Sequence, residues 1–177
     1  MIYGGKELAN AFRTVRKNTI QIAEDIPESK YSYIAAPEVR SVAQSLTHIA
    51  VSTRIFIELN RAGLTTLVGF DFPAYIEPFR AEEAKPRTKA ELIELLRTEG
   101  DKFASWLETL TPEFLAEKVT EPDGKTAKSR FERILGAKEH EMHHRGQLML
   151  IERQLGIVPH ITRLFNERMA QMRAARA

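Results

Sequence analysis

Apolar residues recur every three or four positions along most of this chain, and that spacing is typical of one face of an α-helix. Nowhere do apolar and polar residues alternate for long, so a sheet of any size is not expected. The pattern predicts four main helices and a last one. The first ends before Pro27, the second begins after Ser41 and the third begins after Thr88. The fourth runs from about Thr126 to Leu155, and the last begins at about Ile161. The predicted fold class is therefore all-α: a four-helix bundle with an extra C-terminal helix and an aromatic loop between helices two and three.

Length and composition narrow the class of protein further. A chain of 177 residues fits a single domain, here residues 1–177. Its apolar runs are far shorter than the roughly 20 residues that span a bilayer, and its N-terminus lacks a signal-type apolar segment, so we expect a cytoplasmic protein. The net charge of +2 is spread over interspersed charges, which give no strong field for nucleic acid and argue against that partner. Without cysteine, any metal must be held by His, Asp or Glu.

The stretch HEMHH carries the clearest chemical signal. His140 and His144 are four residues apart, so they lie about 40° apart around a helix and one turn along it. Both imidazoles can then reach one ion, and each would need its own buried partner if packing alone explained it. The pair continues into Leu148 and Ile151, on the face expected to pack inward. This spacing predicts a metal-binding helix.

A third ligand is needed, and His48 on the apolar face of helix two is the candidate. Gln44 and Ser52 flank it, and Gln147 lies beside the late pair; these three are predicted to contact the ligands or the substrate. Two residues are candidates for catalysis. His143 lies on the flank of the metal-binding helix, and Glu99 is a charge on an apolar face. Glu99 is a possible general base or fourth ligand, or a structural glutamate paired with a basic residue such as Arg133.

HEMHH also matches the H-E-x-x-H pattern of zinc metallopeptidases. In that alternative Glu141 is the general base and Glu167 the third ligand. We disfavour it because no strand is expected near the site to hold a peptide, and because it leaves His48 unexplained. We expect Glu141 to project to the rim, and Gly146 to allow a close helix approach.

Three stretches resemble the DinB-like (DinB/YfiT-type) family of helical-bundle metalloproteins: THIA around His48, KYSYIAAPEVRS before it, and HEMHHRGQLMLIERQLG late in the chain. The resemblance implies a site of His48, His140 and His144 in a four-helix bundle that commonly forms homodimers. Some members are metal-dependent S-transferases that use low-molecular-weight thiols, and others are isomerases. Fold alone does not fix the reaction.

These observations favour an enzyme that binds one divalent ion per chain, zinc or nickel, and acts as an S-transferase or hydrolase on a small molecule. The substrate could be a low-molecular-weight thiol. The alternative is a non-enzymatic, metal-stabilised dimeric binding module. Its ion would be closed off by Glu99 or Gln44, and its aromatic loop and C-terminal helix would contact the partner.

Overall fold

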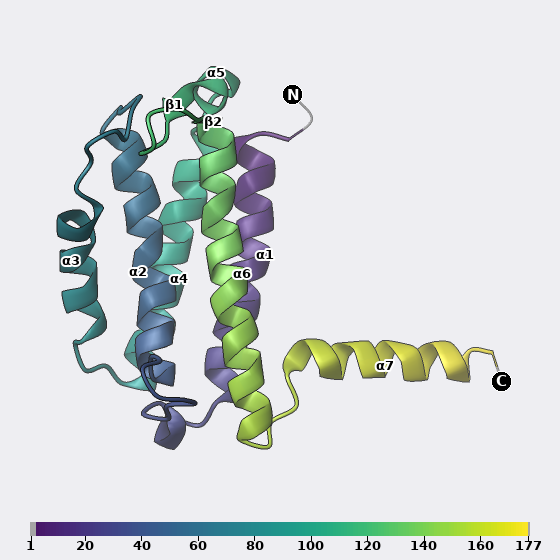
Figure 1. The fold of residues 1–177 in the computed structure, drawn as a ribbon. Coiled ribbons are helices and arrows are strands. Elements are labelled where there is room, and N and C mark those ends of the chain that lie inside the picture. Colours follow the sequence, from purple (N-terminus) through teal and green to yellow (C-terminus); the bar gives the residue numbers. More distant parts are fainter. Residues whose placement is uncertain (1–2, 177) are drawn as a thin grey trace.

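Four long helices form the body of the molecule (Figure 1). The computed structural model describes residues 3–176, and in it the following helices lie side by side: α1 (Gly5–Asp25), α2 (Val42–Arg61), α4 (Lys89–Glu108) and α6 (Arg130–Gln154). α4 packs against α1 and α2, and α6 packs against the same two helices. The predicted all-α bundle is confirmed.

Side-chain caps set where these helices begin. Ser41 Oγ accepts a hydrogen bond from the backbone N–H of Gln44, and Gln44 Oε1 accepts one from the backbone N–H of Ser41. Thr88 and Ser129 cap α4 and α6 in the same reciprocal way. The fourth main helix therefore begins at Arg130 and not at Thr126. The preceding residues pair instead as a short hairpin of β1 (Lys118–Thr120) and β2 (Ala127–Ser129).

The remaining elements lie around the bundle. The predicted aromatic loop contains a helix, α3 (Phe72–Glu83), which packs on α2. Short helical turns are η1 (Glu28–Lys30) and α5 (Pro112–Ala116). The last helix, α7 (His160–Ala174), begins one residue before its predicted start and extends away from the bundle (Figure 1). The expected extra C-terminal helix is thus present, but it adds little to the core.

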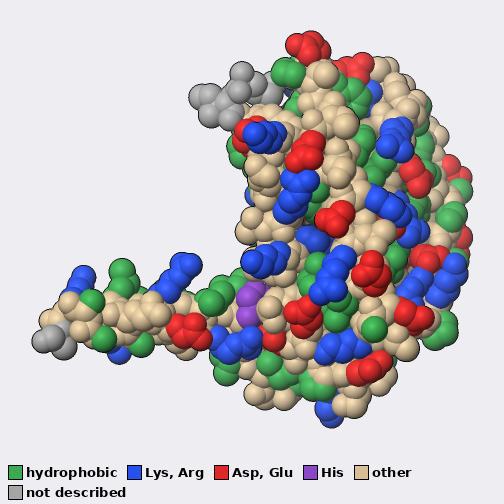
Figure 2. Space-filling view, turned by 180° about the vertical axis from the view of Figure 1, so that it is seen from behind, with side chains coloured by type: hydrophobic (Ala, Val, Ile, Leu, Met, Phe, Trp, Pro, Cys, Tyr) green, Lys and Arg blue, Asp and Glu red, His purple; other side chains and the backbone are tan. Residues whose placement is uncertain are grey.

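The core consists of two clusters stacked along the bundle. One includes Ile22, Leu46 and Leu96, and the other includes Phe12 and Phe103. On the face seen from behind, positive and negative side chains are mixed and neither sign forms a broad field (Figure 2). Within residues 3–176 we find no helix with the length and apolar character needed to cross a membrane.

Candidate metal centre

Three histidines from two helices converge on one point. His48 lies on α2, and His140 and His144 lie one turn apart on α6. The Nε2 atom of His140 is 2.9 Å from Nε2 of His48 and 3.2 Å from Nε2 of His144. One ligand nitrogen of each residue lies within 4.8 Å of the others. The structure therefore brings together the three residues that the sequence singled out.

Behind each ring, the second nitrogen has an oxygen partner. Nδ1 of His48 lies 2.6 Å from Glu83 Oε1, and Nδ1 of His144 lies 2.9 Å from Gln147 Oε1. Nδ1 of His140 lies 3.4 Å from Ser52 Oγ, at the long end of the range. These contacts orient all three rings, as outer partners of metal-binding histidines do.

The same contacts assign the protons. An ionised carboxylate only accepts hydrogen bonds, so His48 Nδ1 donates to Glu83. Ser52 Oγ donates its own proton to the carbonyl oxygen of Ile49, 3.1 Å away, and so accepts from His140. Gln147 directs its amide nitrogen to His143 Nε2 at 3.1 Å, which leaves its oxygen to accept from His144. Each neutral ring then carries its free lone pair on Nε2, and three lone pairs point at one another.

Electrostatics favour the neutral form of His140 and His144. Burial, followed by the charges of His48, His144, His143 and Arg40, lowers the pKa of His140 to about 3. Burial is also the main cause that lowers the pKa of His144. Burial raises the pKa of Glu83, but hydrogen bonds from His48 and Arg40 outweigh it and hold that carboxyl below its usual range. Neutral imidazole is the form that binds metal, so the lowered pKa values of His140 and His144 favour an ion at neutral pH.

The donor set fits a divalent ion. Tetrahedral bonds of 2.0–2.1 Å place ligand nitrogens about 3.3 Å apart, close to the two Nε2 separations described above. Three protein ligands also leave one position for water or substrate, as catalytic sites do. A cavity of about 720 Å³ lies beside His144, with Glu83 and Gln147 also in its wall. His144 thus borders a space of the size that small-molecule sites have.

Comparison with known proteins gives the family. The model of the DinB superfamily matches residues 11–148, which include all three histidines. The chain belongs to the DinB superfamily.

Among DinB relatives, the uncharacterized protein YjoA of Bacillus subtilis (strain 168) is 28% identical over 152 residues, which are 85% of this chain and 90% of YjoA. The crystal structure of YjoA, a DinB-like protein, has a TM-score of 0.63 at 25% identity and covers 85% of this chain and 92% of that one. YfiT from Bacillus subtilis is a probable metal-dependent hydrolase with an unusual four-helix bundle topology. It has a TM-score of 0.66 at 18% identity over 86% of this chain and 88% of its own, which shows the shared fold.

Within this DinB bundle, the other predicted site residues lie at different distances from the histidines. Ser52 and Gln147 contact them directly. Gln44 uses its side-chain oxygen to cap α2, although it also lines the cavity. His143 is exposed and contacts Gln147.

Glu99 lies in a separate ion-pair cluster. Its carboxylate accepts from Arg54 at 2.8 and 3.1 Å and from Lys102 at 2.9 Å. Burial raises the pKa of Glu99, but these two cations lower it below its usual value. Arg133, the partner we suggested from the sequence, pairs with Glu121 instead. Among the described residues, no hydrogen bond joins Glu99 to the three histidines.

Glu141 does not project to the rim, and that expectation was wrong. The side chain is buried, and its carboxylate accepts from Arg16 Nε at 2.9 Å, from Arg16 Nη2 at 2.9 Å and from Thr19 Oγ1 at 2.7 Å. The reason is angular: the residue after His140 lies about 100° further round α6 and faces α1. Glu141 therefore belongs to the interior of the bundle and not to the metal centre.

Arg16 joins the four helices at the level of the histidines. From α1 it donates to Glu141 on α6, to the carbonyl oxygen of Leu96 on α4 at 2.6 Å and to that of Ile49 on α2 at 3.2 Å. Ile49 and Glu141 directly follow His48 and His140 in the chain. The Arg16 contacts therefore fix the two helices that carry the ligands.

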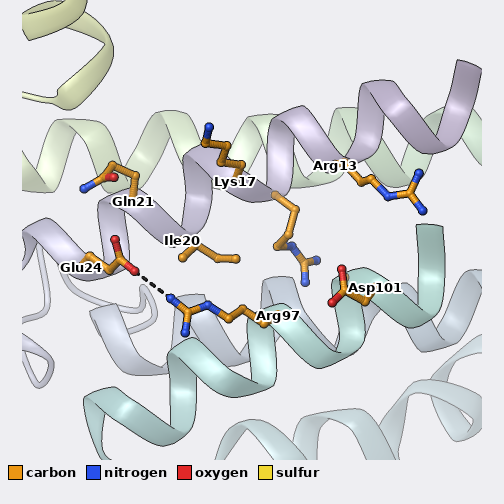
Figure 3. A pocket seen from close by; sticks show the side chains of 9 residues that line it. Arg13, Lys17, Ile20, Gln21, Glu24, Arg97 and Asp101 are labelled. Carbon is orange, nitrogen blue, oxygen red and sulfur yellow. Dashed lines mark hydrogen bonds and ion pairs between the residues drawn. The ribbon is translucent and has the colours of Figure 1, made fainter. Parts of the chain in front are cut away.

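Space for Arg16 comes from Gly100 on α4, where an added Cβ would lie only 2.8 Å from Arg16 Cγ. The outer side of this contact is a cavity of about 470 Å³ between α1 and α4, with the Arg97–Glu24 ion pair in its wall (Figure 3). Gly146, by contrast, has nothing within 4 Å of an added Cβ, so our expectation of a close helix approach there was wrong.

Glu83 is the residue that sequence reasoning missed. It lies at the end of α3, inside the segment we predicted as an aromatic loop, and 35 residues after its partner His48. Its Oε2 also accepts from Arg40 Nε at 2.6 Å. One carboxylate thus links a metal-site histidine to an arginine on the loop before α2.

Proposed function

We propose that this protein is a metal-dependent enzyme in which His48, His140 and His144 hold one divalent ion beside a small-molecule cavity. The observation that carries the proposal is the convergence of three Nε2 lone pairs, each assigned by the partner of Nδ1. Zinc or nickel is the ion we expect, because imidazole nitrogen suits both.

The reaction we propose is hydrolysis of a small molecule. An ion held there would supply Lewis acidity, which lowers the pKa of a nucleophile or polarises a substrate oxygen. The protein's own side chains orient the ligands: Glu83 and Gln147 hold two rings in one tautomer. The shared fold of YfiT, a probable metal-dependent hydrolase, supports this reaction.

Transfer of a thiol is the second candidate. The chain has no cysteine, so the thiol would come from a small external molecule, and the cavity beside His144 offers room for one. Both reactions need the same ion and the same open position. They differ only in the nucleophile.

The other two alternatives have less support. A closed structural ion would need a fourth protein ligand, yet Gln44 caps α2 and Glu99 pairs with Arg54 and Lys102. In the peptidase alternative Glu141 would activate water, but its carboxylate is bound by Arg16 in the interior. Glu167, its expected third ligand, is exposed on α7, which extends away from the bundle.

Metal content measured by elemental analysis, on protein without a histidine tag, tests the proposal. We expect about one ion per chain in the wild type and less than about a tenth of that in His48→Ala, His140→Ala and His144→Ala, because two imidazoles bind far more weakly than three. His143→Ala is the matched control and should keep the ion. If His48→Ala retains a full complement of metal, the proposed site is wrong.

The loaded protein is then assayed with ester and amide substrates and, separately, with a small thiol and an electrophile. Turnover of the ester or amide substrates that needs the ion and is lost in His144→Ala supports hydrolysis. The same result with the thiol and the electrophile supports thiol transfer. Activity that persists in metal-free protein would contradict both.

A further inference from the structure

The cavity beside the histidines has features that the metal site alone does not explain. It lies between the loop before α2, the helices α2 and α3, and the last turns of α6. Several of its lining side chains are exposed, so it is reached from the surface. Its wall combines an apolar part, which favours an aliphatic group, with two arginines, which favour an anion.

The apolar part consists of side chains that a folded protein usually covers. Val39 and Leu150 are 47% and 58% exposed, and both line the cavity together with the buried Ile151. They come from different elements, the loop before α2 and helix α6, and so face a shared space. An aliphatic group placed there would be removed from water along with them.

The charged part consists of Arg40 and Arg80. Arg40 uses Nε to donate to Glu83, and within the described chain its two terminal nitrogens have no hydrogen-bond acceptor. Arg80 is largely exposed, and its ion pair with Glu77 is long, at 3.9 Å. Both guanidinium groups therefore have donors free for an anion.

The balance of charge argues against a doubly charged anion. Two glutamates, Glu38 and Glu83, lie in the same wall as the two arginines, so these four side chains sum to zero and the wall has no excess positive charge of its own. Such a wall suits a carboxylate, whereas a phosphate near −2 would meet the two acidic groups with little compensation. An ion on three neutral imidazoles would keep its full charge and favour an anion further.

We infer that this cavity binds a small monocarboxylate with a short aliphatic part, which is the substrate class of the proposed enzyme. Arg40 and Arg80 donate to the carboxylate, and the aliphatic part packs on Val39 and Leu150. The inference rests on the proposed function for the reaction, since the ion beside His144 marks the reacting end. Binding itself depends on the residues of the wall.

Calorimetric titration with three probes of equal length tests this: hexanoate, 1-hexanol and hexylamine. Zinc-loaded protein should bind hexanoate at least about tenfold more tightly than 1-hexanol, and hexylamine least, because only the carboxylate makes charge-assisted hydrogen bonds with both arginines. Arg80→Gln should weaken hexanoate binding by about tenfold and leave 1-hexanol unchanged. Arg173→Gln, an exposed arginine on α7, is the matched control and should bind like the wild type.

Arg80 is the more decisive variant, because Arg40 also contacts the Glu83 that holds His48. If Arg80→Gln binds hexanoate as well as the wild type does, the carboxylate lies on the ion or elsewhere and the inference is overturned. Equal affinity for hexanoate and 1-hexanol overturns it too.

Zinc content, measured on the same samples, separates the two proposals. Zinc bound without any preference for the carboxylate leaves the proposed function standing and contradicts only the inference. If no zinc binds, the proposed function fails, and titration of the metal-free protein still decides whether Arg80 selects the carboxylate.

Discussion

At the scale of single residues, the chemistry of the site depends on the atoms behind the histidines. Glu83 fixes the proton of His48 on Nδ1 and so leaves Nε2 free for an ion. It also holds Arg40 at the cavity wall. One side chain therefore contacts both a candidate metal-binding histidine and an arginine of the cavity wall.

Replacing Glu83 tests this role. Glu83→Gln keeps an acceptor oxygen but loses the charge, so we expect zinc affinity to fall by about 10–100-fold in a competitive chelator titration. Glu82→Gln is the matched control on the same helix, since Glu82 pairs with Lys85 and Arg87 and not with a histidine. Equal zinc affinity in Glu83→Gln and the wild type would show that the contact with His48 does not tune the site.

The histidines could be predicted from the sequence because their signal is local. Two lie at a helical spacing, and the third lies alone on an apolar helix face. Glu83 carries no such signal, because the segment around it has prolines and no clear period. Gln44 could have been assigned better: S-x-x-Q at the start of a helix is the capping-box pattern, and the cap uses its side-chain oxygen.

At the scale of helices, the close contact between α1 and α4 at Gly100 determines whether Arg16 can cross the bundle. Arg16 was visible in the sequence as a charge between Phe12 and Thr19 on the apolar face of the first helix. Its partner Glu141 could not be recognised in the same way, because Glu141 lies inside the H-E-x-x-H pattern and that pattern indicates metal chemistry. The angular position after His140 would have been the better guide.

Two glycine substitutions test the contact. Gly100→Ala should lower the free energy of unfolding by about 1–3 kcal/mol, because the new methyl group would overlap Arg16 Cγ, which the four-helix contacts hold in place. Gly146→Ala places the same methyl group on α6 in open space and should raise stability by up to about 1 kcal/mol through helix propensity. Urea unfolding measures both, and similar values for the two variants would contradict the packing argument.

At the scale of the whole molecule, stability depends on pH through a buried acid near the point where α7 leaves the bundle. Glu152 is fully buried on α6, and neither carboxylate oxygen has a hydrogen-bond partner within residues 3–176. Burial, with a smaller effect of Asp25, raises the pKa of Glu152 to about 7. The folded state thus prefers the neutral acid.

The sign of the pH effect follows. A pKa raised from 4.5 to about 7 gives stability that is complete below pH 4.5 and is lost as the pH rises through 7. Glu152→Gln stays neutral, so its Tm relative to the wild type should be higher at pH 8.5 than at pH 5, by about 3 °C or more. Glu139→Gln, exposed on the same helix, should show no such difference. A Tm gap for Glu152→Gln that is the same at both pH values would contradict the assignment.

The arrangement of the bundle followed from helical periodicity and caps, whereas the direction of α7 did not. Its apolar residues, such as Leu164, Phe165 and Met172, predict an amphipathic helix but remain exposed. Periodicity shows which face is apolar and not what covers it. The homodimer expected from the family resemblance therefore stays a prediction.

Glu83 comes from an element outside the four long helices. The core clusters are formed mainly by the four long helices, whereas the carboxylate behind His48 comes from α3, which packs on the outside of α2. Displacement of α3 would therefore leave these clusters in place and remove the hydrogen-bond partner of His48 Nδ1. A chain with a packed core and a displaced α3 would be folded but would lack the contact between Glu83 and His48. The fraction of chains that fold and the fraction that bind metal tightly would then differ.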